Sequence, residues 1–364
     1  MKEEMDKRIQ KLRKSLSARR LDAALITGPE NRFYLSGFLA EDPGLTESAG
    51  ALLISRASKI LLTDGRYEIQ ARQQAPDFEI AIYKKGLAYT LKRLFSKIGV
   101  KRCAYEPAFI SCSRFEGLKR AVAGVSWHVL GDICLKMRLL KDGQERQRIR
   151  KAQKAAESVF EQVFPEIMPG RTEKEIAFMI LEGLHVRADG PSFPPIVASG
   201  PNSALPHAVP SDRKIKEGEP VIVDMGARLG GYCSDMTRTV FCGSPSEKFR
   251  KIYSVVREAQ NAAQEAVRPG MTGREADSLA RKVIEGAGLG RYFVHALGHG
   301  VGIAIHEAPA VSSGCRKKLR EGMVFTVEPG IYVQGEGGVR LENMGLLRES
   351  GFEIMTSERW FYDF

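Results

Sequence analysis

The chain has 364 residues, more than one domain usually holds, so we expect two domains, each with its own core. Hydrophobic residues make up 43% and charged residues 27%, which excludes a disordered or fibrous chain. The net charge of +11 raises the question of nucleic-acid binding. The basic clusters in residues 2–20 and 138–154 are not interleaved with aromatic residues, however, and are spaced like the solvated faces of helices. We therefore expect no nucleic-acid partner.

The first twenty residues are polar and charged, as in an amphipathic surface helix, and lack the apolar stretch of a secretory signal. The longest apolar runs, such as residues 51–54, are far shorter than the roughly 20 residues that cross a bilayer. Six cysteines are spread along the chain without a CxxC pair, which is typical of idle thiols in a reducing compartment. We expect a soluble cytoplasmic protein that does not bind membranes.

The first part of the chain alternates strands and helices. Residues 22–27, 50–55 and 59–65 are predicted as short apolar strands, and residues 87–98 as a helix with apolar side chains at helical spacing. The domain closes with residues 125–133. This pattern predicts an α/β domain.

A long helical stretch without Pro or Gly follows Gly143, so the domain boundary is predicted near residues 131–140. We expect an amino-terminal domain over 1–133 and a second domain over 138–364.

The second part of the chain repeats one order of elements. Helices are predicted to about residue 188, Gly- and Pro-rich strands over 191–240, two helices over 246–266 and 273–287, and further strands from residue 295. This order hints at a duplicated α+β unit, although sequence self-similarity alone does not establish it.

Two strand-like runs on either side of a Gly-Gly turn carry Asp224 and Asp235. If Leu229 and Gly230 form a two-residue hairpin loop, the two carboxylates lie directly opposite each other, with Cβ atoms about 5 Å apart. Carboxylates that close repel each other unless a cation lies between them. Taken alone, this hairpin fits solvent-facing strand residues equally well.

A second predicted hairpin carries Glu328 and Glu342 around a Gly-rich turn centred at Gly335, which sets these two acids opposite each other as well. A β-bulge would shift either pairing by one residue. Two hairpins that each present an opposed pair of acids favour a functional site over solvent-exposed acids without a function.

Four of the six histidines lie in the second part of the chain: His207, His295, His299 and His306. Three of them stand in HALGHGVGIAIHE, where the glycines argue against a helix and leave room for a ligand near the backbone. A lone histidine is more often structural, but this grouping favours function.

Four carboxylates with a histidine form an oxygen-rich ligand set. Such a set suits Mn²⁺, Co²⁺ or Fe²⁺ better than a closed structural zinc site. Two ions that share a carboxylate and a bridging hydroxide would activate water, which implies hydrolysis.

In the motifs that contain these residues, the chain resembles the pita-bread metallopeptidases, the group of aminopeptidase P, prolidase and methionine aminopeptidase. The resemblance rests on successive motifs within residues 140–364. The first domain, including LTDGRY, is similar to the creatinase-type amino-terminal domain of the Xaa-Pro branch. The resemblance therefore implies an α/β creatinase-like domain followed by an α+β pita-bread catalytic domain. The motifs are SGPNSALPHA, DMGARLGGYCSDMTRTV, HALGHGVGIAIHEAP, GMVFTVEPGIY and GVRLEN.

The resemblance also implies residue roles. Asp224 would bind one metal ion and His299 the other, Asp235 and Glu342 would bridge both, and Glu328 would bind the second ion and shuttle a proton. Accessory residues would contact the scissile carbonyl and the tetrahedral intermediate, or orient the carboxylates; these are His207, His295 and His306 for the first task and Arg340 for the second.

The implied reaction is hydrolysis of the Xaa-Pro bond in dipeptides or at the amino terminus of longer peptides, with two Mn²⁺ ions expected and a homodimer as the family's usual assembly. Two positions depart from the family pattern. Asn343 stands where many relatives have an acid, and Ala310 where some prolidases have an arginine for the substrate carboxylate. The alanine favours longer Xaa-Pro peptides over dipeptides.

Two other functions fit the same fold. A pita-bread protein that binds no metal could act as a binding module for peptides, histones or RNA, and a creatinase-like enzyme could hydrolyse small guanidino compounds without metal. The complete ligand set disfavours both.

Overall fold

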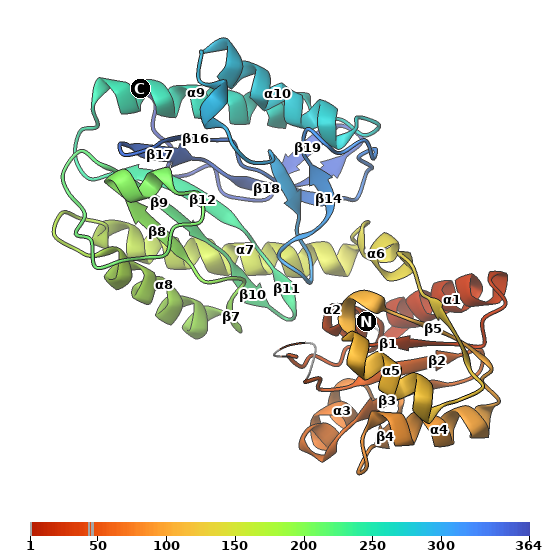
Figure 1. Cartoon of the computed structure of the whole chain (residues 1–364). Coiled ribbons are helices and arrows are strands. Elements are labelled where there is room, and N and C mark those ends of the chain that lie inside the picture. The colour runs from red at the N-terminus through yellow and green to blue at the C-terminus, as the bar shows by residue number, and fades with distance from the viewer. Residues whose placement is uncertain (1, 43, 45–46) are drawn as a thin grey trace. The chain divides into compact units, whose positions relative to one another are not determined.

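The structure is a computed structural model that describes residues 2–42, 44 and 47–364 and divides into two compact units, Met1–Arg138 and Leu139–Phe364 (Figure 1). The division predicted from the sequence, 1–133 and 138–364, stays a prediction. Among the described residues, every helix is too short or too polar to cross a bilayer.

The first unit is an α/β domain built on a six-stranded sheet in the order β4-β3-β2-β1-β5-β6. The strands predicted at 22–27, 50–55 and 59–65 and the helix at 87–98 are all present. The elements are α1 (Lys2–Ala18), β1 (Ala23–Ile26), α2 (Pro29–Ser36), β2 (Ala51–Ser55), β3 (Lys59–Thr63), α3 (Glu68–Gln74), β4 (Glu79–Ile82), α4 (Leu87–Ile98), β5 (Arg102–Tyr105), α5 (Cys112–Ala121), β6 (Ser126–Val129) and α6 (Ile133–Arg138), with 3₁₀ turns at Gly65–Tyr67 and Pro107–Phe109.

Every residue of β1 and β2 is buried, as expected for central strands covered on both faces. Helices α4 and α5 pack apolar side chains, including Leu91 and Leu118, onto the sheet. Helix α1 buries Ile9, Leu12 and Leu16, which recur at helical spacing.

The second unit is α+β, with strands between two helix pairs. Its helices are α7 (Gly143–Val163), α8 (Glu173–Arg187), α9 (Glu247–Ala266) and α10 (Gly273–Gly286), with 3₁₀ turns at Phe164–Glu166, Gly200–Ala204 and Gly290–Tyr292. Its strands are β7 (Gly190–Pro191), β8 (Ile196–Ser199), β9 (Pro220–Met225), β10 (Ala227–Leu229), β11 (Tyr232–Cys233), β12 (Met236–Phe241), β13 (Gly298–Gly300), β14 (Glu307–Val311), β15 (Val324–Val327), β16 (Gly330–Val333), β17 (Gly337–Arg340), β18 (Asn343–Arg348) and β19 (Gly351–Ile354).

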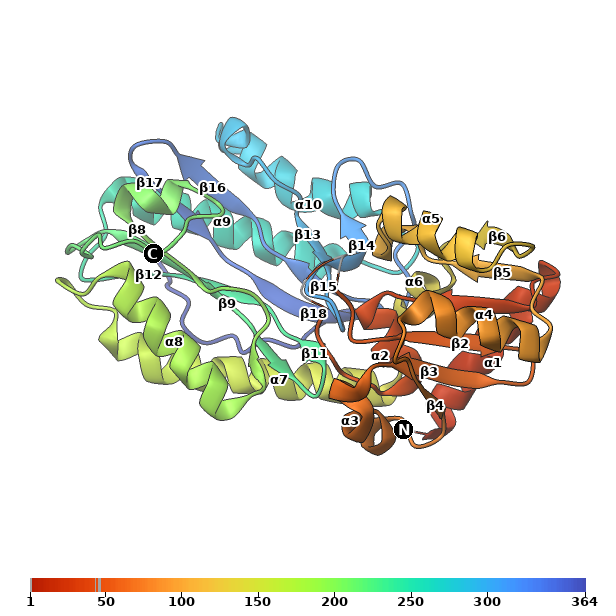
Figure 2. The same cartoon turned by 60° about the horizontal axis from the view of Figure 1, so that its bottom comes forward.

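Helices α7 and α8 lie on one side of these strands and α9 and α10 on the other (Figure 2). The first pair packs on β8, β9 and β12, with Phe160 and Val223 in the shared core. The second pair packs on the strands from β15 onward, with Val256 and Phe325 in a second core. The strands that lie between the two cores carry the candidate site.

The two helix pairs begin their second helix in the same way. Thr172 caps α8 and Thr272 caps α10, each through a reciprocal capping box with the glutamate three residues later. Each threonine also forms an isolated bridge, to Lys214 and Lys318 respectively. The structure thus shows the duplicated α+β unit that the order of elements suggests. A shared PGxTxxE motif at the start of α8 and of α10 marks the duplication in the sequence.

The hairpin centred at Gly335 has the predicted register. Val327 pairs with Asn343 on one side, and Gly330 pairs with Arg340 on the other. Glu328 and Glu342 lie between these pairs at the same register. The two glutamates are therefore opposed as predicted.

The register predicted for the other hairpin is wrong by two residues. Asp224 pairs with Thr237 and not with Asp235. The turn residues are Gly230 and Gly231, with φ of +58° and +79°, because a tight type I′ turn needs positive φ at both central positions. Side chains alternate with a period of two, so this shift leaves both aspartates on the predicted face.

Two glycines of this hairpin differ in what they tolerate, which gives a test of the register. A Cβ at Gly226 would lie 1.9 Å from the Ser234 carbonyl oxygen, whereas nothing lies within 4 Å of a Cβ at Gly230. Gly230→Ala should cost only the backbone strain of a left-handed residue, about 1–2 kcal/mol of unfolding free energy. Gly226→Ala should cost clearly more, because the strands must separate. Urea denaturation of both variants measures the difference, and equal losses would contradict the observed pairing.

Candidate metal centre

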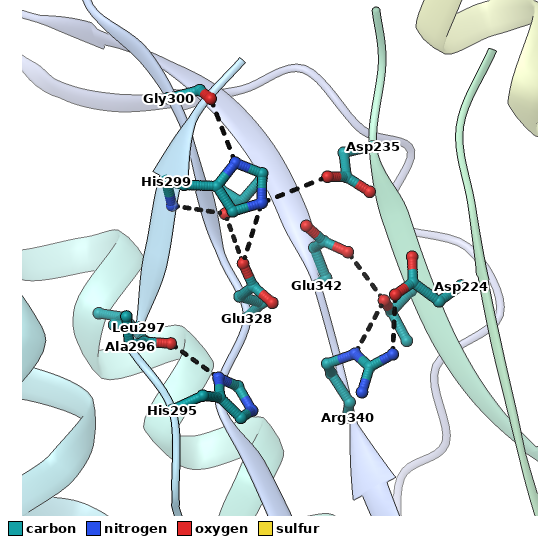
Figure 3. Close-up of polar contacts among 12 residues, drawn as sticks. Asp224, Asp235, His295, Ala296, Leu297, His299, Gly300, Glu328, Arg340 and Glu342 are labelled. Carbon is teal, nitrogen blue, oxygen red and sulfur yellow. Dashed lines mark hydrogen bonds and ion pairs between the residues drawn. The ribbon is translucent and has the colours of Figure 1, made fainter. Parts of the chain in front are cut away.

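The structure brings the five predicted ligands together from five segments of the second unit (Figure 3). Asp224 lies on β9 and Asp235 just before β12, Glu328 follows β15, Glu342 precedes β18, and His299 lies on β13. Their side chains converge on a cavity of about 520 Å³ that all five line. Asp235, His299 and Glu342 each offer a ligand atom, and these atoms lie within 4.8 Å of one another.

The orientation of His299 favours a cation. Its Nδ1 lies 3.1 Å from the Gly300 carbonyl oxygen, which only accepts hydrogen bonds, so Nδ1 carries the proton. Burial lowers the pKa of His299, so the ring is neutral and Nε2 has a free lone pair. That lone pair faces carboxylate oxygens of Asp235 at 3.5 Å and Glu328 at 3.4 Å. These contacts are not ion pairs, and a metal ion between the atoms would turn repulsion into coordination.

The carboxylates repel one another in a buried place. Burial, and then the charge of nearby Glu342, raises the pKa of Asp235 well above its usual range. Burial and the charge of Glu328 do the same for Glu342, and burial raises the pKa of Glu328. Two buried oxygens, Asp224 Oδ1 and Glu342 Oε1, have no hydrogen-bond partner among the described residues. Acceptors left without a donor at the centre of an acidic cluster fit metal ligands.

Arg340 is the cation that the protein itself supplies. Its Nη2 lies 2.7 Å from Asp224 Oδ2, Nη1 donates to Tyr332 Oη at 2.8 Å and to the Pro206 carbonyl oxygen at 3.2 Å, and Nε donates to Thr237 Oγ1 at 3.3 Å. Burial alone would lower the pKa of Arg340, but Tyr332 and Asp224 raise it, so the side chain stays charged. It fixes one oxygen of Asp224 and leaves the other free toward the cavity.

Tyr332 is a site residue that sequence reasoning missed. Its hydroxyl accepts from Arg340 and lies 2.9 Å from His295 Nε2. His295 Nδ1 faces the Ala296 carbonyl oxygen at 2.8 Å, so Nε2 is the acceptor and Tyr332 donates to it. The strand period of two puts Tyr332 on the same face as Glu328, which is the signal that could have found it.

The other two predicted histidines also line the cavity. His306 packs edge-on against His299, with ring centroids 4.4 Å apart, and burial and that neighbour lower its pKa. His207 lies exposed on the loop after β8. An imidazole N–H beside an acidic cavity can donate a hydrogen bond to a bound carbonyl oxygen.

The two departures from the family pattern lie outside the ligand cluster. Asn343 donates to Glu358 Oε1 at 2.6 Å and accepts from Arg238, whose other nitrogen donates to the Glu342 carbonyl oxygen at 2.6 Å. Asn343 therefore influences Glu342 through Arg238, which bonds the backbone of Glu342. Ala310 is exposed on β14 and pairs with His299.

With the geometry known, comparison with other proteins decides the family. Residues 147–349 match the model of metallopeptidase family M24, and residues 8–140 match that of the creatinase/prolidase N-terminal domain. The chain belongs to metallopeptidase family M24. The M24 domain is the pita-bread domain and the first unit is the creatinase N-terminal domain, as the resemblance implies.

Full-length relatives agree with this assignment to the M24 family. The chain is 36% identical to "Xaa-Pro dipeptidase" of Pyrococcus furiosus over 97% of this chain and 98% of the relative. It superimposes on a "Xaa-Pro dipeptidase from Bacillus anthracis" with a TM-score of 0.91, at 35% identity and covering 97% and 98% of the two chains. An X-Pro aminopeptidase from Thermotoga maritima MSB8 gives 0.87 at 37% identity, with 94% and 97% covered.

The electrostatics of the cluster predict opposite effects of Asp235→Asn with and without metal. Without metal, the variant relieves repulsion between buried carboxylates and should be more stable than the wild type at pH 7.5 by about 1 kcal/mol or more. With Mn²⁺, the wild type should gain thermal stability and the variant little. Thermal unfolding in EDTA and in Mn²⁺ measures both.

The pH dependence has a defined sign. The pKa of Asp235 is raised in the folded state, because the buried cluster favours the protonated carboxyl. The stability that this protonation contributes is fully present below the unfolded pKa near 4, and it is lost as the pH rises through the folded pKa. In EDTA, the advantage of the Asn variant should therefore grow with pH. Asp212→Asn, at an exposed position, is the control. An advantage that shrinks with pH would contradict buried repulsion at Asp235.

Arg340→Lys tests the role of the guanidinium fork. Lysine keeps the charge but cannot hold Asp224, Tyr332 and the Pro206 carbonyl oxygen together. We expect metal affinity to fall about tenfold to a hundredfold. Calorimetric titration with Mn²⁺ measures it, with Arg171→Lys as the control at a half-exposed ion pair. Unchanged affinity would mean that Arg340 does not orient the ligands.

Proposed function

We propose that the protein is a metal-dependent exopeptidase that hydrolyses the Xaa-Pro bond. Support comes from the M24 and creatinase N-terminal domains and from full-length relatives named Xaa-Pro dipeptidase. The observation that carries the proposal is the convergence of four carboxylates and the neutral His299 on one cavity. Neither a metal-free binding module nor a metal-free guanidino hydrolase is favoured, because both leave the four carboxylates of this buried cluster insufficiently balanced by the charge of Arg340.

Two divalent metal ions fit this cluster. Their ligands would be Asp224, Asp235, His299, Glu328 and Glu342, and the oxygen-rich set favours Mn²⁺ over Zn²⁺, with Co²⁺ and Fe²⁺ as possible substitutes. When bound, the ions supply an activated water nucleophile and Lewis acidity toward the scissile carbonyl.

The protein's own groups would carry the proton and hold the substrate. Glu328 has a raised pKa and lines the cavity, so it can take a proton from water and pass it to the leaving proline nitrogen. His207 and His306 would donate hydrogen bonds to the carbonyl oxygen as negative charge develops on it, and His295, whose two ring nitrogens are engaged by Ala296 and Tyr332, would contact the substrate beside them. Arg340 and Tyr332 would hold Asp224 and His295 in place.

One wall of the cavity suits a proline ring. Apolar side chains line it beside the acid cluster, among them Phe193, Ile196 and Val209. Proline has no amide hydrogen, so a site that recognises it must rely on ring packing rather than on an N–H contact. We propose that these side chains form the proline-binding wall.

The choice between dipeptides and longer peptides depends on a counter-charge for the substrate's carboxylate. Ala310 offers none, whereas an arginine there would bind that group. We propose that peptides longer than two residues are cleaved at least as well as dipeptides.

Two further expectations concern the setting in which the enzyme works. We propose a homodimer, the usual assembly of this family. We also propose a cytoplasmic location, which the six unpaired thiols among the described residues support.

The activity test uses Ala-Pro and Ala-Pro-Ala at equal concentration with Mn²⁺ and with Co²⁺. The wild type should release alanine from both, with kcat/KM for the tripeptide equal or higher. Asp235→Asn should lose about a thousandfold or more, because it removes a ligand of the nucleophile-activating ions. No cleavage of either peptide, or full activity of the Asn variant, would refute the proposed function.

A further inference from the structure

Glu173 is a fully buried carboxylate outside the metal cluster, at the first position of α8. Its Oε1 accepts hydrogen bonds from Ser199 N at 2.7 Å, Ser199 Oγ at 2.8 Å and Asn202 Nδ2 at 3.1 Å. Its Oε2 accepts from Asn202 Nδ2 at 3.1 Å, Ser211 N at 3.0 Å and Ser211 Oγ at 2.6 Å. Six hydrogen bonds from five donor atoms compensate its burial, and the amino end of the helix adds favourable charge.

These bonds join the two ends of one loop. Ser199 and Ser211 bracket the segment that contains Pro206 and His207, so one carboxylate bonds both ends of the loop at its base, beside the hydrogen bond that Arg213 Nη1 donates to Ser199 Oγ at 2.7 Å. The His207 ring is exposed and has no hydrogen-bond partner in the described part of the chain. Its position therefore depends on the loop backbone, which also receives the Arg340 contact at Pro206.

The other half of the duplicated unit shows that this helix start does not require a carboxylate. Gly273 begins α10 as Glu173 begins α8. The Gly273 amide donates to Lys317 O, as that of Glu173 donates to Arg213 O. A Cβ at Gly273 would lie 2.3 Å from the Ala310 carbonyl oxygen, so this half closes by direct backbone packing. The carboxylate thus serves the loop of the first half, which carries His207.

We propose that Glu173 is a positioning residue that holds His207 over the metal cluster by closing the 199–211 loop. The proposal rests on the proposed function for its kinetic readout only. The closure itself is a structural property that hydrogen exchange reports without any activity.

Glu173→Gln is the main variant, because an amide nitrogen must then face the donors of either Ser199 or Ser211. We expect kcat for Ala-Pro-Ala to fall by about tenfold to a hundredfold, the effect of a displaced catalytic group. Glu175→Gln is the matched control, because Glu175 lies two residues further in the same helix turn and its carboxylate accepts hydrogen bonds from its capping partner Thr172 alone among the residues that the structure describes. This variant should leave kcat within about twofold.

Combination with His207→Ala separates positioning from general stabilisation. If Glu173 acts through His207, the Gln substitution should change kcat by less than about twofold in the His207→Ala background. An equal loss in both backgrounds, or no loss in the wild type, would overturn the proposal. Should Glu173→Gln fail to fold, Ser211→Ala removes only one of the six bonds and must show a smaller loss with the same dependence on His207.

Hydrogen exchange of the Ser199 and Ser211 amides gives an independent readout. Exchange should rise in Glu173→Gln and not in Glu175→Gln. Unchanged exchange would overturn the loop closure even in an active enzyme. Faster exchange in a protein without peptidase activity would refute the proposed function and leave the closure intact.

Discussion

The repulsion among four carboxylates gathered in one cavity is the constraint on which the rest of the site depends. Asp224, Asp235, Glu328 and Glu342 line this cavity, and the protein places one guanidinium, that of Arg340, against them. One positive charge cannot balance four negative ones in a medium of low dielectric constant, so the pKa values of the uncompensated acids rise. Bound cations resolve this conflict, and the neutral His299, with its lone pair turned toward the acids, shows the same preference.

The surrounding fold keeps this unfavourable arrangement in place. Thr237 donates to Glu342 Oε2 at 2.8 Å, which leaves Oε1 without a hydrogen-bond partner among the described residues, and Thr326 donates at 2.9 Å to Glu328 Oε1, the oxygen that faces His299 Nε2. Glycines make room for these contacts: a Cβ at Gly330 would lie 2.5 Å from Tyr332 Oη, which links Arg340 to His295. The buried carboxylates destabilise the fold, and the two hydrophobic cores under the helix pairs offset this cost, as is usual for functional sites.

The sequence predicts the parts of the site that local rules determine. Glu328 and Glu342 are correctly predicted to lie opposite each other, because their turn is centred on a glycine and the strands continue without a bulge. The Asp224 hairpin is misread by two residues, because its two-residue turn needs positive φ at both positions, which Gly230 and Gly231 adopt and a leucine at position 229 disfavours. Both aspartates still reach the cavity, since an even shift preserves the face. Tyr332 is recoverable from strand periodicity. Glu173 is not, because its partners lie 26 to 38 residues away and no local pattern marks them.

The central claim, that cations complete an acid cluster which the protein alone leaves unbalanced, is tested most directly by counting bound metal. Equilibrium dialysis of the metal-free protein against Mn²⁺ should give two ions per chain for the wild type and fewer than two for Asp235→Asn, since that residue would contact both ions. Absence of bound Mn²⁺ in the wild type, or the same stoichiometry and affinity in the variant, would contradict the account.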